Sequence, residues 1–207
     1  NKAGNTPLMI ISHHNNLATL KFLADKFPSQ IFDFSNVNNN GFTALSLAVV
    51  KGNYEYISTM VKLSLKSIEK VINKVNNQGN SSLLLASQNG YIDIIELLHQ
   101  NFGPTLDVNI VNENGNTALI FSVITSDTTA TLLNLFPNVD INDKNEDGMS
   151  ALHIAALYKN FDAFKSILDH SKNNNIVLDI NAKDYDGIPV VVHLLLGNKS
   201  SILSDLL

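Results

Sequence analysis

The chain has 207 residues, of which 44% are hydrophobic and 16% charged, so it is long and apolar enough to bury the core of one or two domains. It contains no cysteine, which excludes disulfides, thiolate metal sites and a cysteine nucleophile, and fits a reducing compartment. All 14 basic residues are lysine, so the chain lacks the bidentate guanidinium fork that favours phosphate and guanine.

The net charge of −5 is unevenly distributed. Residues 1–75 carry eight lysines and four acidic residues, whereas residues 76–207 carry six lysines and 15 acidic residues. The acidic part would repel nucleic acid and anionic membranes. No segment approaches the ~20 consecutive apolar residues of a membrane-spanning helix. We therefore expect no nucleic-acid partner and no membrane insertion.

A short motif built around a glycine recurs along the chain at intervals of 33–39 residues. Its glycines are Gly4, Gly41, Gly79, Gly115, Gly148 and Gly187. An amide or acid stands three residues before each of them, as Asn1, Asn38, Asn76, Asn112, Asn145 and Asp184. A glycine and a polar residue that recur together at a fixed spacing indicate an internal repeat. The repeats lie near residues 1–34, 35–72, 73–108, 109–141, 142–180 and 181–207.

After each glycine the sequence takes on a helical pattern. In the fifth repeat Ser150 is a good helix N-cap, and the residues that follow are largely apolar. After a short break a second amphipathic run follows, as in residues 91–98 and 161–168, with apolar residues at three- and four-residue spacing. The residues expected at the break between the two helices are Gly52, Gly90, Asn160 and Asn198.

The repeated motif resembles the T-P-L-H-x-A signature of the ankyrin repeat family, whose unit of about 33 residues is a β-turn followed by two antiparallel helices. The stretch DGMSALHIAA, residues 147–156, is the best match. The resemblance covers essentially residues 1–207 and implies an all-α solenoid. About six β-turn/helix-turn-helix units would stack as a single array, and each would bury an apolar face against its neighbours.

The repeats depart from the family pattern in three ways. They are longer, and we expect extended loops at residues 27–33, 65–70, 102–106 and 172–177. Residues 126–127 replace a glycine, so the second helix of the fourth repeat is expected to start differently. Pro189 stands where the family has threonine, so the first helix of the sixth repeat is expected to begin late.

The sequence predicts no catalytic site, cofactor or metal site. His13 and His14 are adjacent, and adjacent helical side chains point about 100° apart, so they do not form a two-ligand pair. Residues 143–147 resemble half of a calcium loop, but Gly148 is in phase with five glycines that lack such acids, which favours a polar turn. The resemblance implies that His153 hydrogen-bonds the backbone of the hairpin region. We therefore expect the chain not to be an enzyme.

The resemblance also implies a partner surface on the concave side, formed by hairpin tips and outward positions of the first helices. The strip from Phe121 to Tyr158 is apolar, and acidic residues at 146, 147 and 186 accompany it. This combination predicts a protein or peptide partner with an apolar anchor and basic residues; the alternative is that some of these side chains are buried between helices. The predicted partner-binding residues are Phe42, Leu47, Val50, Lys51, Gln88, Phe121, Ile124, Thr125, Met149, Ile154, Leu157, Tyr158 and Tyr185, with His193 at the outward position of the sixth repeat.

We expect a cytoplasmic protein–protein interaction scaffold of undetermined oligomeric state. The alternative is a regulatory or targeting ankyrin segment of a larger enzyme or channel. The chain begins at a hairpin tip and ends at Leu207 without the polar cap that a terminal repeat needs, which predicts that it is a fragment of a longer chain.

Overall fold

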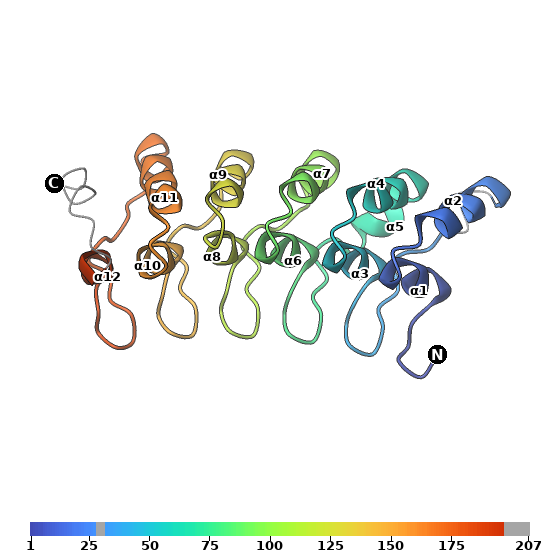
Figure 1. The fold of residues 1–207 in the computed structure, drawn as a ribbon, viewed down its shortest axis with the longest axis horizontal. Helices are drawn as coiled ribbons and strands as arrows, with labels where there is room; N and C mark the ends of the chain where they lie inside the picture. Colours follow the sequence, from blue (N-terminus) through green and yellow to red (C-terminus); the bar gives the residue numbers. More distant parts are fainter. Residues whose placement is uncertain (28–31, 197–207) are drawn as a thin grey trace. The chain divides into compact units, whose positions relative to one another are not determined.

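The computed structural model describes residues 1–27 and 32–196, and within them short helices come mostly in pairs (Figure 1). The N-terminal unit, Asn1–Glu113, and the C-terminal unit, Asn114–Leu207, are each compact. The N-terminal unit holds α1 (Pro7–His13), α2 (Leu17–Lys26), α3 (Ala44–Val50), α4 (Tyr54–Leu63), α5 (Leu65–Glu69), α6 (Ser82–Gln88) and α7 (Ile92–Phe102). The C-terminal unit holds α8 (Ala118–Ser122), α9 (Ser126–Leu135), α10 (Ala151–Leu157), α11 (Phe161–Asn173) and α12 (Val190–Leu196).

The all-α class is confirmed. The extended segments of the described chain form isolated β-bridges, such as Val37 with Thr43 and Lys144 with Ser150. Each of the first five predicted repeats contains a helix pair, and α12 is the first helix of the sixth. Within each unit the first helices pack against one another, and so do the second helices. Continuity of one array from residue 1 to residue 207 stays a prediction.

The first helix of every repeat begins three residues after the repeat glycine. In four repeats the side chain just before the helix accepts a hydrogen bond from the backbone N–H of the third helical residue, which satisfies a donor that the helix leaves unpaired. These N-caps are Thr6, Thr43, Ser81 and Thr117. A leucine recurs four residues after the repeat glycine, and Leu45, Leu83, Leu119 and Leu152 are at most 1% exposed, whereas Leu8 in the first repeat is half-buried.

Two expectations about helix boundaries are wrong. The helix α12 does not begin late: it starts at Val190, three residues after Gly187, as in the other repeats. Proline is tolerated at a helix start because its missing N–H would have no partner there, so Pro189 does not delay the helix. The expected loop at residues 65–70 contains α5, which buries Ser67 and Ile68.

The second helices begin as predicted. The break before four of the five second helices is made by a residue with positive φ, at Asn15 (52°), Gly52 (66°), Gly90 (68°) and Lys159 (58°). Asn160 follows such a residue and caps α11, while Asn198 lies outside the described residues. The fourth repeat differs, as expected: α9 starts at Ser126 without a side-chain cap hydrogen bond, and no glycine precedes it.

The hairpins before the first helices are joined to one another by backbone hydrogen bonds within each unit. The residue that follows the repeat asparagine or aspartate donates its N–H to the carbonyl just before the glycine of the preceding hairpin. The five bonds are Asn39 to Ala3, Asn77 to Asn40 and Glu113 to Gln78 in the N-terminal unit, and Glu146 to Asn114 and Tyr185 to Asp147 in the C-terminal unit, with N···O distances of 3.0–3.1 Å.

The short distance between neighbouring hairpins also explains why the repeat glycine is required. Gly79 has a φ of +77°, and a Cβ placed on it would lie 2.7 Å from the Cα of Asn112 in the next hairpin. A side chain would therefore be strained by the backbone conformation and blocked by the neighbouring backbone. Gly187 has nearly the same φ, +76°, but a Cβ there would have no described atom within 4 Å.

We expect Gly79→Ala to destabilise the chain by about 1–3 kcal/mol more than Gly187→Ala. Both variants carry the cost of a left-handed alanine, and only Gly79→Ala adds the clash with the next hairpin. Urea unfolding of the two variants and the wild type measures the difference. Equal losses would show that the close approach of the hairpins has no energetic consequence.

A ladder of side-chain amides runs beside the backbone bonds. Where an asparagine follows the repeat glycine, the asparagine of the next hairpin donates to its side-chain oxygen: Asn38 to Asn5 (2.7 Å), Asn112 to Asn80 (3.0 Å) and Asn145 to Asn116 (3.2 Å). Phe42 occupies the position after Gly41, and the buried Nδ2 of Asn76 is left without a hydrogen-bond partner. A buried unpaired donor costs about 1–3 kcal/mol.

At position 42 asparagine should therefore give a more stable protein than leucine, which has nearly the same shape. We expect Phe42→Asn to exceed Phe42→Leu in stability by about 1 kcal/mol, because only the asparagine side chain supplies an acceptor for Asn76. In an Asn76→Ala background, which removes both the donor and any acceptor at this position, the preference should disappear. Chemical unfolding of the four variants completes the cycle, and an unchanged preference in the Asn76→Ala background would contradict the assignment.

Candidate partner-binding surface

The ends of the first helices are solvent-exposed in every repeat for which they are described. The ninth and tenth residues after the repeat glycine are exposed in both units. They are His13, His14, Val50, Lys51, Gln88, Asn89, Ile124, Thr125, Leu157 and Tyr158. These positions lie where a helix stops, beyond the face that packs on neighbouring helices, so their side chains are available to a partner.

In the N-terminal unit the predicted surface is largely polar. Lys51 and Gln88 are exposed, and Val50 is 40% exposed. Phe42 is half-buried. The side chain of Leu47 is only 9% exposed because it lies on the buried face of α3, so it offers little area to a partner.

In the C-terminal unit the same positions are more apolar. Tyr158 is 69% exposed, Ile124 64% and Leu157 44%. Phe121 and Ile154, one helical turn earlier, are half-buried. Here large apolar side chains keep much of their surface in water, which is often the sign of an interaction surface when they form a patch.

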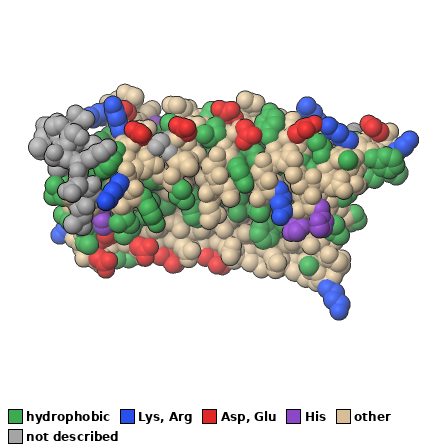
Figure 2. All heavy atoms as spheres, in the orientation of Figure 1, with side chains coloured by type: hydrophobic (Ala, Val, Ile, Leu, Met, Phe, Trp, Pro, Cys, Tyr) green, Lys and Arg blue, Asp and Glu red, His purple; other side chains and the backbone are tan. Residues whose placement is uncertain are grey.

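The hairpin tips of the C-terminal unit extend this apolar group with an aromatic and acidic side chains. Tyr185 is 78% exposed, and its ring runs past Gly148, while Met149 is half-buried. Asp147 and Asp186 are exposed on the hairpins, and Figure 2 shows acidic side chains along this edge. Exposed apolar and negatively charged groups therefore belong to one unit, and their role as a partner surface stays a prediction.

His153 is a structural residue. It is fully buried; its Nδ1 accepts a hydrogen bond from the backbone N–H of Ser150 at 3.2 Å, and its Nε2 lies 2.9 Å from the carbonyl oxygen of Ala182. An Nδ1 that accepts from an amide and an Nε2 that donates to a carbonyl define a neutral imidazole with its proton on Nε2. The predicted bond to the next hairpin is confirmed.

His193 does not point outward as expected. It is 7% exposed, and its Nε2 lies 2.9 Å from Oδ2 of Asp184. The other carboxylate oxygen accepts from the N–H of Ile188 at 2.8 Å. Sequence reasoning missed this pair, although one signal was present: position 184 is an aspartate where the other five repeats have asparagine. In the preceding hairpin the residue after the glycine is Met149, which has no side-chain amide. The carboxylate of Asp184 is paired with His193 instead.

Burial and hydrogen bonding set the charge states of this cluster. Burial lowers the pKa of His153 below 6.5, against a smaller opposing effect of its bond to Ala182. Burial alone would raise the pKa of Asp184, but hydrogen bonds from Ile188 and His193 outweigh it and hold the pKa below 3.8. His153 is therefore a neutral imidazole and Asp184 an ionised carboxylate, and both are held for structure.

The described residues contain no group of three His, Cys, Asp or Glu side chains that could hold a metal ion. None of the described helices is long and apolar enough to cross a membrane.

Comparison with known proteins agrees with this geometry. The family model for ankyrin repeats matches residues 1–69 and 83–184, so the chain belongs to the ankyrin repeat family. The structure is similar to the crystal structure of the ankyrin repeat domain of Bcl-3, described as a unique member of the IkappaB protein family, with 24% identity, a TM-score of 0.71 and coverage of 92% of this chain and 79% of that chain. It is also similar to EF0377, an ankyrin repeat protein, with 21% identity, a TM-score of 0.75 and coverage of 92% and 90%. The comparison with curated proteins gave no match.

Stability should decrease as the pH falls below about 6.5. The lowered pKa of His153 means that the unfolded chain binds a proton before the folded chain does, and His170, also buried, acts in the same direction. The contribution of each such histidine to the free energy of unfolding is fully present above that pH. Below it, each one lowers the free energy of unfolding by up to about 1.4 kcal/mol per pH unit. Urea midpoints at pH 7.5 and 5.5 measure the loss. His153→Gln should reduce the difference between the two midpoints, and an undiminished difference would contradict the assignment.

Proposed function

We propose that this chain is a protein-interaction module that acts by binding and has no catalytic chemistry of its own. Ankyrin repeats are in general protein–protein interaction modules, and the fold is typically a non-catalytic scaffold. The observation that carries the proposal is the apolar surface of the C-terminal unit, where Ile124, Leu157 and Tyr158 are 44–69% exposed at helix ends that need no apolar side chain.

The chemistry of this surface defines the partner. Tyr158 and Tyr185 supply large, rigid contact areas, which are common at interaction hot spots. Exposed Glu146, Asp147 and Asp186 lie on the hairpins of the same unit. A protein or peptide with an apolar anchor and flanking basic residues would satisfy both features, while nucleic acid would be repelled. Val50, Lys51 and Gln88 are exposed in the N-terminal unit and stay predicted partner contacts of that unit.

The buried histidines support a role in binding rather than chemistry. His153 and His193 are at most 7% exposed, and hydrogen bonds to Ala182 and Asp184 occupy them. A general acid or base has to reach a substrate proton, and neither ring is placed to do so. The cytoplasmic location remains a prediction from the cysteine-free sequence.

The double variant Ile124→Asp/Tyr158→Asp tests the surface. Both side chains are more than 60% exposed, so the variant should fold normally and lose partners by about tenfold or more in affinity. The matched control is Val177→Asp, an 86% exposed apolar residue in the loop after α11. Quantitative capture from lysate, with thermal unfolding as the check on folding, compares the three proteins. If the double variant and the control retain the same partners as the wild type, the surface is wrongly assigned.

A further inference from the structure

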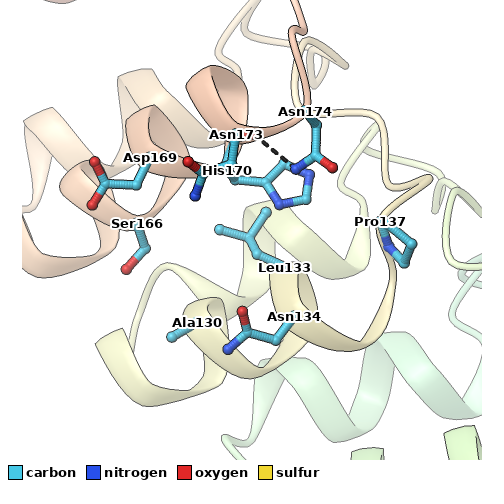
Figure 3. Close-up of a pocket in the computed structure, with 9 residues that line it drawn as sticks. All are labelled: Ala130, Leu133, Asn134, Pro137, Ser166, Asp169, His170, Asn173 and Asn174. Atoms are coloured by element: carbon cyan, nitrogen blue, oxygen red, sulfur yellow. Dashed lines mark hydrogen bonds between the residues drawn. The ribbon is translucent and has the colours of Figure 1, made fainter.

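A pocket of about 410 Å³ opens between α9 and α11 in the C-terminal unit (Figure 3). Its apolar wall comes from Ala130, Leu133 and Pro137, at the end of α9 and just beyond it. The α11 side is polar and includes Ser166, Asp169 and His170. The volume falls within the range of small-ligand sites. This pocket lies on the second helices, so it is separate from the partner surface on the first helices and does not depend on the proposed function.

One wall of the pocket contains an unsatisfied polar group. His170 is 8% exposed, and its buried Nε2 has no hydrogen-bond partner. Buried side-chain nitrogens are nearly always paired in proteins, and an unpaired one costs about 1–3 kcal/mol. Burial lowers the pKa of His170, so the ring is neutral at physiological pH and carries one nitrogen lone pair that can accept a hydrogen bond. In the tautomer with the proton on Nδ1, Nε2 is that acceptor, and a bound donor would complete it.

Three further lining residues, Ser166, Asn174 and Asp169, offer acceptors beside the amide groups of Asn134 and Asn173. The hydroxyl of Ser166 donates to the carbonyl of Asp162 at 2.9 Å, so only its lone pairs remain available. Nδ2 of Asn174 donates to the carbonyl of His170 at 2.9 Å, which leaves its Oδ1 as an acceptor. The exposed carboxylate of Asp169 adds two acceptor oxygens and a negative charge.

The electrostatics of the pocket favour a cation. No lysine is among the lining residues. Leu133 and Asn134 lie in the last turn of α9, and the lining residues of α11 include its last turn, so the C-terminal ends of two helices meet there. Lys172, in the last turn of α11, is not a lining residue. Each helix C-terminus carries a partial negative charge of about half an electron, which attracts cations. Phosphates and carboxylates would be repelled.

We propose that the pocket between α9 and α11 binds the guanidinium group of an arginine side chain in a partner polypeptide. A guanidinium presents five N–H donors in a plane, which suits several separated acceptors better than a compact ammonium does. The apolar wall formed by Ala130, Leu133 and Pro137 accommodates the methylene stem of the side chain. The chain itself contains no arginine, so the side chain comes from a different polypeptide and not from a second copy.

Titration of the full 207-residue chain with N-acetyl-L-arginine methylamide, followed by ¹H–¹⁵N NMR, tests the site. We expect shift changes confined to α9, α11 and the His170 ring, with millimolar affinity, as is usual for a single residue. The apparent pKa of His170 should fall further on saturation, because a bound cation opposes protonation. The citrulline analogue has the same shape without the charge and should bind about tenfold more weakly, as should the lysine analogue.

Two variants separate the pocket from general charge effects. Asp169→Asn removes the carboxylate and should weaken arginine binding about tenfold, while Asp162→Asn, on the same helix but outside the pocket lining, should leave it unchanged. Both should give the wild-type amide spectrum away from the substitution. Equal binding of the arginine, lysine and citrulline probes would overturn the proposal. So would equal effects of the two variants, or the absence of local shifts, which would mean that the pocket holds only water.

Discussion

The fold depends on how closely consecutive hairpins approach one another. An amide of each hairpin donates to the carbonyl before the glycine of the previous hairpin, and this brings the two backbones too close for a Cβ at Gly41, Gly79 or Gly115. The glycine is thus required both by its positive φ and by its neighbour. Because each first helix begins three residues later, the hairpin register also fixes which helix face is buried within each unit.

The side chains beside this backbone ladder vary more than the ladder itself. Asparagine pairs with asparagine in three places, Phe42 leaves Asn76 unpaired, and Asp184 pairs with His193 instead. All five backbone bonds persist through these changes. The amide ladder therefore adjusts the stability of individual repeats, whereas the backbone bonds and the glycine determine the architecture.

The sequence was sufficient for the architecture because the repeat glycine, the N-cap and the buried leucine recur at fixed spacing. It was less reliable where a residue has two acceptable roles. Pro189 looked like an obstacle to a helix and is compatible with its first turn. From its position in the repeat His193 was expected to point outward, yet it is buried against Asp184, nine residues earlier in the chain. Asp184 pairs with His193 because Met149, in the preceding hairpin, has no side-chain amide to offer. The pocket at His170 gave no sequence signal, because it arises from two helices that are far apart in the chain.

The positions that the architecture leaves free carry the functional argument. The ninth and tenth residues after the glycine are exposed in both units, so packing does not dictate their chemistry. Val50 and Lys51 are a short apolar residue and a charge, as expected for a solvated helix end, whereas Ile124, Leu157 and Tyr158 keep large apolar areas in water. Leaving such areas exposed forgoes about 25 cal/mol for each Å² that burial would remove from water. A partner that covers these side chains would recover that free energy, and this is why we assign binding to the C-terminal unit first.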